Sequence, residues 1–351
     1  MAAPHRLSAL ADDQAGLARW ALGRMAATAA EDVRFGAEAE CGQHRVPGDL
    51  SGRYGWHEEG YEVKPGAMEL SSPARLHLQG VSTAGLRRED EAAGDALLSL
   101  CDPARLVSGV ADASGGRCAW EGERPCVEVT LVPHPWTADP EDPWLPPGAT
   151  RLRVRVDTAT GFLLRARAYD ERGCFRSGRL RDLRVAAGAG PESAGGAAPL
   201  VLARMATAVL EPVRLSAEVE AVPEAEAGLT PASLPSNRSW SVTLPGTAAP
   251  PVEISGNYVP DQADPAAARL AELLTPARIV SHLADATATG PDSIEATVRP
   301  LRSFPFSAWA PEAPLTCRFT VDPSTGVLLR AHTLDGTRTL SRAEVTVHAR
   351  H

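Results

Sequence analysis

The 351-residue sequence contains one pattern twice, and this duplication limits the fold more than any other feature. RMAATAAEDVRFGAEAE (24–40) matches RMATAVLEPVRLSAEVE (204–220) at nine of 17 positions, with an offset of 180. CDPARLVSGVADAS, from Cys101, matches LTPARIVSHLADAT at an offset of 173. VDTATGFLLRA (156–166) matches VDPSTGVLLRA (321–331) at eight of 11 positions, with an offset of 165. Three matches in one order predict two copies of a single unit, the second having lost loop residues.

A stretch of small residues, AAGAGPESAGGAAP (186–199), separates the copies. It has no apolar periodicity, which is typical of a flexible linker. We therefore predict a first unit over 1–187, a linker over 188–199 and a second unit over 200–351.

Each copy shows the same order of local patterns. Apolar residues at helical spacing (17–25 and 202–209) predict an opening helix, and strict alternation (33–39 and 213–219) predicts a half-buried strand. Asp102-Pro103 and Thr275-Pro276 indicate the start of a middle helix, with the first residue as N-cap. A hairpin turning at Thr-Gly and one further strand close each copy. The predicted class is α+β, with two tandem units, each an antiparallel curved sheet, or half-barrel, wrapped over helices.

The closing hairpins, VDTATGFLLRARAYDERG (156–173) and VDPSTGVLLRAHTLDG (321–336), carry a resemblance to a known family. With the element order around them, they resemble the outer-membrane lipoprotein carrier (LolA) superfamily, which includes RseB-type regulators and mycobacterial glycolipid-binding lipoproteins. The resemblance covers nearly the whole chain, one unit per half. It implies an open half-barrel whose concave face holds acyl chains, without catalysis, and it transfers no site residues.

Composition excludes several function classes. Lys and Arg number 35 against 44 Asp and Glu, so a net charge of −9 disfavours a nucleic-acid partner. The sequence has no H-E-x-x-H, P-loop or G-x-S-x-G motif, and no metal site or cofactor is expected. Asp157 and Asp322 recur, but each begins a turn in which Asp hydrogen-bonds the backbone. We therefore expect that the protein is not an enzyme.

The sequence also bears on the compartment. No apolar run reaches 18 residues, so no transmembrane segment is expected. Asp12, Asp13 and Gln14 interrupt any secretory apolar core. The chain as written is expected to be cytoplasmic, or to belong to the cell envelope if its N-terminus is truncated.

An aromatic and proline-rich loop precedes the closing hairpin in each copy, VPHPWTADPEDPWLPPG (132–148) and VRPLRSFPFSAWAPEAP (298–314). One interpretation is that its rings cap the open end of a half-barrel as core. The other is a rim or lid that binds ligand over an apolar cavity. The candidate ligand-binding residues are Trp136, Trp144, Phe304, Phe306 and Trp309.

Six cysteines do not form a disulfide framework or a zinc pattern. Cys118 and Cys126 flank a turn-like stretch and could face each other across a hairpin. They would bridge in an oxidising compartment and remain free thiols in a reducing one.

Two functions follow from these observations. The first is a non-enzymatic carrier of a hydrophobic or acylated ligand held in half-barrel cavities. The alternative is a protein–protein interaction or regulatory module of the RseB type. The sequence does not specify the ligand, the partner or the oligomeric state.

Overall fold

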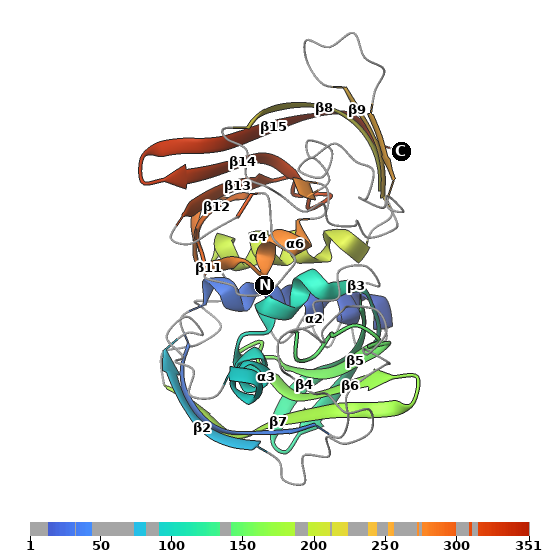
Figure 1. The fold of residues 1–351 in the computed structure, drawn as a ribbon, viewed down its shortest axis with the longest axis vertical. Coiled ribbons are helices and arrows are strands. Elements are labelled where there is room, and N and C mark those ends of the chain that lie inside the picture. Colours follow the sequence, from blue (N-terminus) through green and yellow to red (C-terminus); the bar gives the residue numbers. More distant parts are fainter. Residues whose placement is uncertain are drawn as a thin grey trace, which may run out of the picture. The chain divides into compact units, whose positions relative to one another are not determined.

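A computed structural model describes the protein over residues 13–31, 33–43, 74–81, 91–133, 142–186, 196–210, 213–223, 238–243, 252–255, 272–273, 276–299, 309–310 and 315–350. The chain divides into two compact units (Figure 1). The N-terminal unit comprises residues 2–21 and 32–190, and the C-terminal unit comprises residues 22–31 and 191–351. This grouping differs from the predicted boundaries at residues 22–31. The predicted units themselves stay a prediction.

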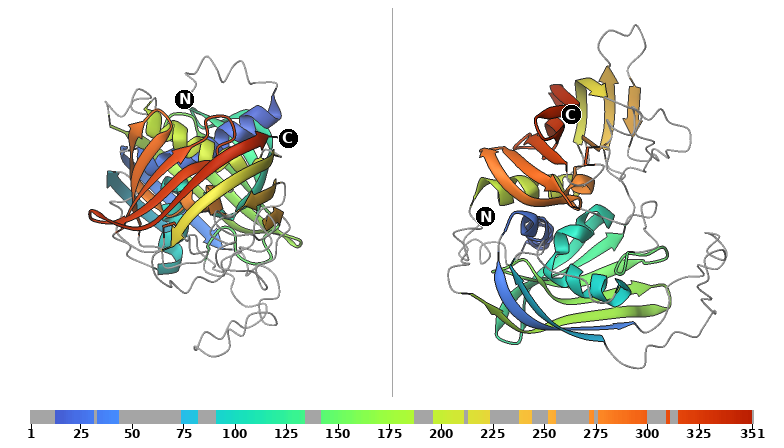
Figure 2. Two further views of the ribbon diagram at one scale, coloured as in Figure 1. Left: turned by 90° about the horizontal axis from the view of Figure 1, so that it is seen from above. Right: turned by 60° about the vertical axis from the view of Figure 1, so that its left-hand side comes forward.

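A seven-stranded sheet forms the N-terminal unit, in the order β2-β1-β7-β6-β5-β4-β3. All its neighbouring strands are antiparallel. The strands are β1 (Arg34–Gln43), β2 (Ala74–Val81), β3 (Val110–Glu121), β4 (Arg124–Pro133), β5 (Arg151–Asp157), β6 (Leu163–Asp170) and β7 (Gly173–Val185). The sheet curves around helix α3 (Glu91–Cys101), as Figure 2 shows. The outer face of this sheet is the face turned away from α3, and the concave face is the opposite one.

Alternation along the strands explains which face is buried. Leu152, Val154 and Val156 of β5 are fully buried, as are Ala166 and Ala168 of β6. The arginines between these residues therefore point to the outer face. Burial of the apolar set against α3 fixes the register, because a slip of one residue would turn every arginine inward.

The C-terminal unit has an eight-stranded sheet in the order β10-β9-β8-β15-β14-β13-β12-β11. Its strands are β8 (Val213–Pro223), β9 (Arg238–Thr243), β10 (Val252–Ser255), β11 (Leu283–Gly290), β12 (Ser293–Val298), β13 (Thr316–Val321), β14 (Leu328–Asp335) and β15 (Arg338–Arg350). Helix α4 (Ala197–Thr207) packs on β11, β12 and β13. It begins within the range predicted as linker.

One strand pair departs from the predicted antiparallel pattern. β8 and β9 are parallel, with Val213 opposite Arg238 and Leu215 opposite Trp240. Parallel neighbours need a connection of about a dozen residues or more. The segment between Pro223 and Arg238 is long enough. The α+β class with two curved, unclosed sheets is otherwise confirmed.

The predicted opening helices are present as α2 (Gln14–Ala27) and α4. Leu17, Leu22 and Met25 are fully buried, as the spacing predicts. The middle helix was predicted wrongly, because Pro103–Gly109 forms the 3-10 helix η3. Its Asp102 makes no side-chain cap hydrogen bond and instead pairs with Arg105 at 2.8 Å. The counterpart α6 (Ala277–Val280) is a single turn, and α3 was not predicted at all.

The repeated aspartates have the predicted turn role. The carboxylate of Asp157 accepts hydrogen bonds from the backbone N–H and the hydroxyl of Thr160, at 2.9 and 2.7 Å. Asp322 accepts from the backbone N–H of Ser324 at 2.8 Å. Gly161 and Gly326 follow with φ of 78° and 71°, a region that favours glycine. Each unit therefore has the same turn at the corresponding position.

Candidate functional site

Two of the five predicted rim residues lie in described parts of the chain, and both are buried. Trp144 is 0% exposed and Trp309 is 2% exposed. Trp136, Phe304 and Phe306 lie outside the described residues. The two tryptophans are 165 positions apart, which is the offset of the closing hairpins. They therefore occupy corresponding positions at this offset.

The surroundings of Trp144 are those of a core residue. Its indole Nε1 donates to the backbone oxygen of Ala96 in α3, at 3.0 Å. A Cβ added to Gly178 of β7 would lie 2.6 Å from Cη2 of the ring. Trp144 thus fills the space between α3 and the sheet, as the capping interpretation expects. The rim interpretation stays a prediction for the three undescribed rings.

A cationic side chain also lies on the concave face of the N-terminal sheet. Arg176 of β7 lies opposite the buried Ala168 and is half-buried. Burial lowers the pKa of its guanidinium, against the opposing fields of Cys41 and Asp142. Arg176 thus places a charged group on a face whose other described strand residues are mainly apolar.

The outer face of the same sheet has a very different character. Five arginines from three adjacent strands lie side by side on it, and we call them the arginine array: Arg153, Arg155, Arg165, Arg167 and Arg179. The register places Arg153 directly opposite Arg167, and Arg155 directly opposite Arg165. Arg165 in turn lies opposite Arg179. Like charges in directly opposed cross-strand positions destabilise a sheet.

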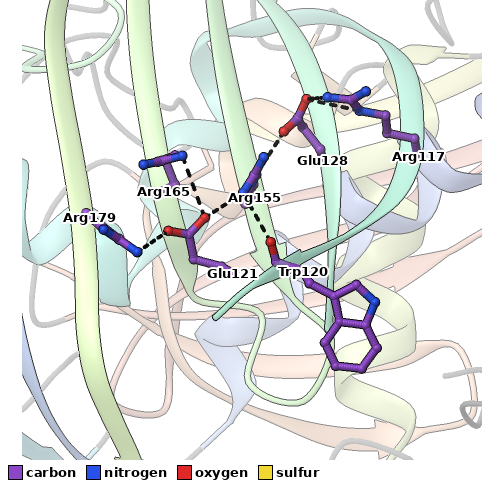
Figure 3. A network of polar contacts seen from close by, with 7 residues as sticks. All are labelled: Arg117, Trp120, Glu121, Glu128, Arg155, Arg165 and Arg179. Atoms are coloured by element: carbon purple, nitrogen blue, oxygen red, sulfur yellow. Dashed lines mark hydrogen bonds and ion pairs between the residues drawn. The ribbon is translucent and has the colours of Figure 1, made fainter. Parts of the chain in front are cut away.

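Two carboxylates bind the array directly, as Figure 3 shows, and a third, Glu40 of β1, lies opposite Arg179 and pairs with Arg181. Glu121, at the end of β3, binds Arg155 at 2.6 Å and Arg179 at 2.7 Å, and lies 3.8 Å from Arg165. Glu128 of β4 accepts from Nε of Arg155 at 2.8 Å and also pairs with Arg117. Both carboxylates are buried, whereas the arginine side chains that bind them reach solvent.

The neutralisation stops at one side of the array. Arg153 and Arg167 are exposed, and neither side chain has a hydrogen-bond or ion-pair partner among the described residues. The next cross-strand pair on this face is Arg151 and Tyr169, and the guanidinium of Arg151 lies 4.6 Å from the centroid of the Tyr169 ring. The array therefore keeps an exposed pair of guanidinium groups.

Electrostatics follows this geometry. Burial lowers the pKa of Arg165, and the positive charges of Arg167, Arg179 and Arg155 lower it further, while Glu121 opposes the shift. Burial raises the pKa of Glu128, but hydrogen bonds from Arg155 and Arg117 outweigh this and leave it below 4.5. The field over the array is thus positive and favours anions.

The described residues of the C-terminal unit form no such array. At an offset of 165, the five arginines become Arg318, Thr320, Arg330, His332 and Glu344. Arg318 pairs with Glu295, and Arg330 lies 3.7 Å from Glu344. The Glu128–Arg155 pair is replaced by a hydroxyl contact of 3.0 Å between Ser293 and Thr320. Arg342, opposite His332, adds a third arginine to this face, where Glu295 and Glu344 supply two carboxylates.

An aromatic side chain lies next to the array but on the other face of β3. Trp120 is 65% exposed, and its backbone oxygen accepts a hydrogen bond from Arg155 at 3.1 Å. Because strand residues alternate, its ring points away from Glu121, as Figure 3 shows. The hairpin of β3 and β4 therefore offers a carboxylate on one face and an exposed indole on the other.

The disulfide between Cys118 and Cys126 is not formed, and both residues are free thiols. The register pairs Cys118 with Val127 and Ala119 with Cys126, one position out of step. Cys118 is exposed and Cys126 is buried, on opposite faces of the hairpin. Burial raises the pKa of Cys126 to about 11.

In the part of the chain that the structure describes, no three His, Cys, Asp or Glu side chains gather in a way that could hold a metal ion. None of the described helices combines the length and apolar character needed to cross a membrane.

The arginine array was missed as a site from the sequence. Its signal was present in RLRVRVD and RARAYD, where arginines occupy alternate positions (151, 153, 155, 165 and 167) between buried apolar residues. Such alternation indicates only a solvated strand face. The excess charge becomes visible when the register brings three strands together and shows how few carboxylates accompany them.

No family model matches the sequence, and no curated protein matches it significantly. Among solved structures, a crystal structure of MucB aligns with a TM-score of 0.28 and 15% identity, covering 94% of this chain and 92% of that chain. The complex structure of Pseudomonas aeruginosa MucA/MucB aligns with a TM-score of 0.25 and 14% identity, covering 94% of each chain. The crystal structure of MucB in complex with MucA(peri) aligns with a TM-score of 0.26 and 15% identity, again covering 94% of each chain. At these TM-scores and identities, the likeness establishes neither a function nor a site for this chain.

Proposed function

We propose that this protein is a non-enzymatic binding module that docks a polypeptide partner on the outer face of its N-terminal sheet. One observation carries the proposal. The two units share a fold, a turn and a buried tryptophan, yet among the described residues directly opposed arginines occur in the N-terminal unit alone, where they outnumber the carboxylates beside them. An arrangement that costs folding stability and is absent from the sister copy is typical of a functional surface.

Photo-crosslinking in the cells that produce the protein tests this function. Benzoylphenylalanine replaces Ser177, which lies opposite Arg167 on the outer face. The matched control replaces Arg342, which lies opposite His332 in the C-terminal unit. We expect a discrete polypeptide adduct from position 177 and none from 342. Equal adducts from both positions, or none from position 177, would overturn the proposal.

A hydrophobic or acylated ligand, as the LolA-like resemblance implies, is the second candidate. The observation that favours it is Arg176, a half-buried cation on an otherwise apolar concave face, which suits the anionic head of an acyl ligand. Native mass spectrometry of the purified chain tests it. A retained lipid mass that is lost in Arg176→Leu supports a carrier, and a ligand-free mass refutes it.

A further inference from the structure

We infer that the partner's docking segment is acidic, and that Arg153 and Arg167 bind its carboxylates while Glu121 occupies the rest of the array as an internal competitor. This inference rests on the proposed function and adds the chemistry of recognition. It concerns one occupant only, a polypeptide segment rich in Asp or Glu.

The first step is the chemistry that the array already performs. Each of its two resident anions is a carboxylate held by guanidinium groups, and Glu128 receives hydrogen bonds from both Arg117 and Arg155. Guanidinium and carboxylate match in planar, paired hydrogen bonds. The array is therefore suited to carboxylates, and Arg153 and Arg167 offer the same groups to solvent.

The second step is spacing. Arg153 and Arg167 are direct cross-strand neighbours, and the next pair, Arg155 and Arg165, lies two residues along each strand. Side chains two residues apart on a strand project to one face at about 6.5–7 Å spacing. An extended acidic segment with carboxylates at alternate positions would meet both rows.

The third step concerns Glu121. Its carboxylate contacts Arg155, Arg165 and Arg179. These arginines lie next to the exposed pair, Arg153 and Arg167. Glu121 is the last residue of β3, and the next residue, Gly122, has a φ of 61° and begins the turn to β4. Removing the charge of Glu121 would release Arg165 and Arg179 for the incoming segment, while Arg155 would keep its contact with Glu128. Glu121 therefore limits affinity.

Fluorescence anisotropy with the full chain tests the inference, using a labelled peptide of alternating Glu and Ala as the probe and its Gln counterpart as the neutral reference. We expect the Glu peptide alone to bind. The double variant Arg153→Gln/Arg167→Gln should weaken binding by about tenfold or more, and Glu121→Gln should tighten it by about tenfold. The matched control, Arg318→Gln/Arg330→Gln, should leave binding unchanged.

Two further measurements separate the alternatives. Arg153→Lys/Arg167→Lys keeps the charge but loses the planar fork, so it should bind more weakly than the parent chain if carboxylates are recognised. Circular dichroism melts of every variant establish that each one is folded.

Equal binding of the Glu and Gln peptides, or indifference to the Arg153→Gln/Arg167→Gln change, overturns the inference. Array-dependent binding of phosphatidylglycerol vesicles without peptide binding also overturns it and assigns the face to a lipid surface. If position 177 yields a polypeptide adduct while the Glu peptide fails, the proposed function stands and only the acidic partner falls.

Discussion

The N-terminal and C-terminal units have the same order of β-strands in their shared part, yet their outer faces differ sharply. Five arginines on β5, β6 and β7 correspond to two arginines, a threonine, a histidine and a glutamate on β13, β14 and β15. Both inner faces are largely apolar, each with a buried tryptophan at the corresponding position. Packing therefore explains what the copies share. The difference lies where packing imposes no demand, which is why we assign function to the N-terminal outer face.

The largest expected effect concerns the buried tryptophan that both units share. Trp144→Ala and Trp309→Ala should each lower the free energy of unfolding by about 3–5 kcal/mol, because both rings are fully buried. Chemical denaturation measures this loss. Trp120→Ala is the control, since its exposed ring should cost no more than about 0.5 kcal/mol. A small loss at Trp144 or Trp309 would return them to the role of a mobile rim.

A second change probes where the two cores differ in detail. Gly178 has its counterpart at an offset of 165 in Ala343, which is fully buried. Gly178→Ala should destabilise the protein by about 1–3 kcal/mol, because the new methyl group would overlap the Trp144 ring. Ala343→Gly serves as the reverse substitution, and it should also destabilise by opening space in its own core. A neutral Gly178→Ala would show that Trp144 does not pack against β7.

Acid titration compares Glu128, a carboxylate bound to the arginine array, with Glu31, which belongs to the C-terminal unit. Hydrogen bonds from Arg155 and Arg117 overcome the effect of burial and lower the pKa of Glu128 below 4.5. Its contribution to stability is therefore present above pH 4.5 and is lost as the pH falls through the lowered value.

Glu31 behaves in the opposite way. Burial raises its pKa above 4.5, although Arg24 pairs with it at 2.5 Å. Its favourable contribution is complete below pH 4.5 and is lost as the pH rises through the raised value. Carboxyl ¹³C NMR of the folded chain should give titration midpoints on the two sides of 4.5. Coincident midpoints would contradict the assigned surroundings of both groups.

The smallest effect concerns thiol reactivity. Cys118 of the N-terminal unit is exposed and should react with iodoacetamide at the rate of a free thiol. Cys126 should be protected, and so should Cys317 of the C-terminal unit, because burial raises their pKa values to about 11 and 12. Mass spectrometry of the alkylated chain measures the order. Rapid modification of Cys126 would show that the hairpin opens.

The sequence predicted the elements whose periodicity is strong. The opening helix and the closing hairpin followed from apolar spacing that the core then buries, as at Leu17 and Val154. The middle helix failed because Asp102-Pro103 is equally compatible with a 3-10 turn, in which Asp102 binds the Arg105 side chain. The parallel β8–β9 pair depends on a long connection whose direction no local pattern specifies.

The site was less predictable than the fold for a physical reason. Trp144 and Trp309 stood out by composition, but large aromatic rings gain most from burial, and both entered the core. Arg153 and Arg167 appeared as ordinary polar positions in separate strands. Their opposition depends on the register between β5 and β6, and their excess charge depends on where Glu121 falls across the sheet.

The most direct test of the central claim is NMR of the arginine Nε–Hε groups in the full chain during titration with the alternating Glu–Ala peptide. The account predicts that the signals of Arg153 and Arg167 shift saturably, while those of Arg318 and Arg330 remain in place. Shifts of equal size in both units, or saturable shifts confined to the C-terminal unit, would contradict the assignment of the N-terminal outer face as the binding surface.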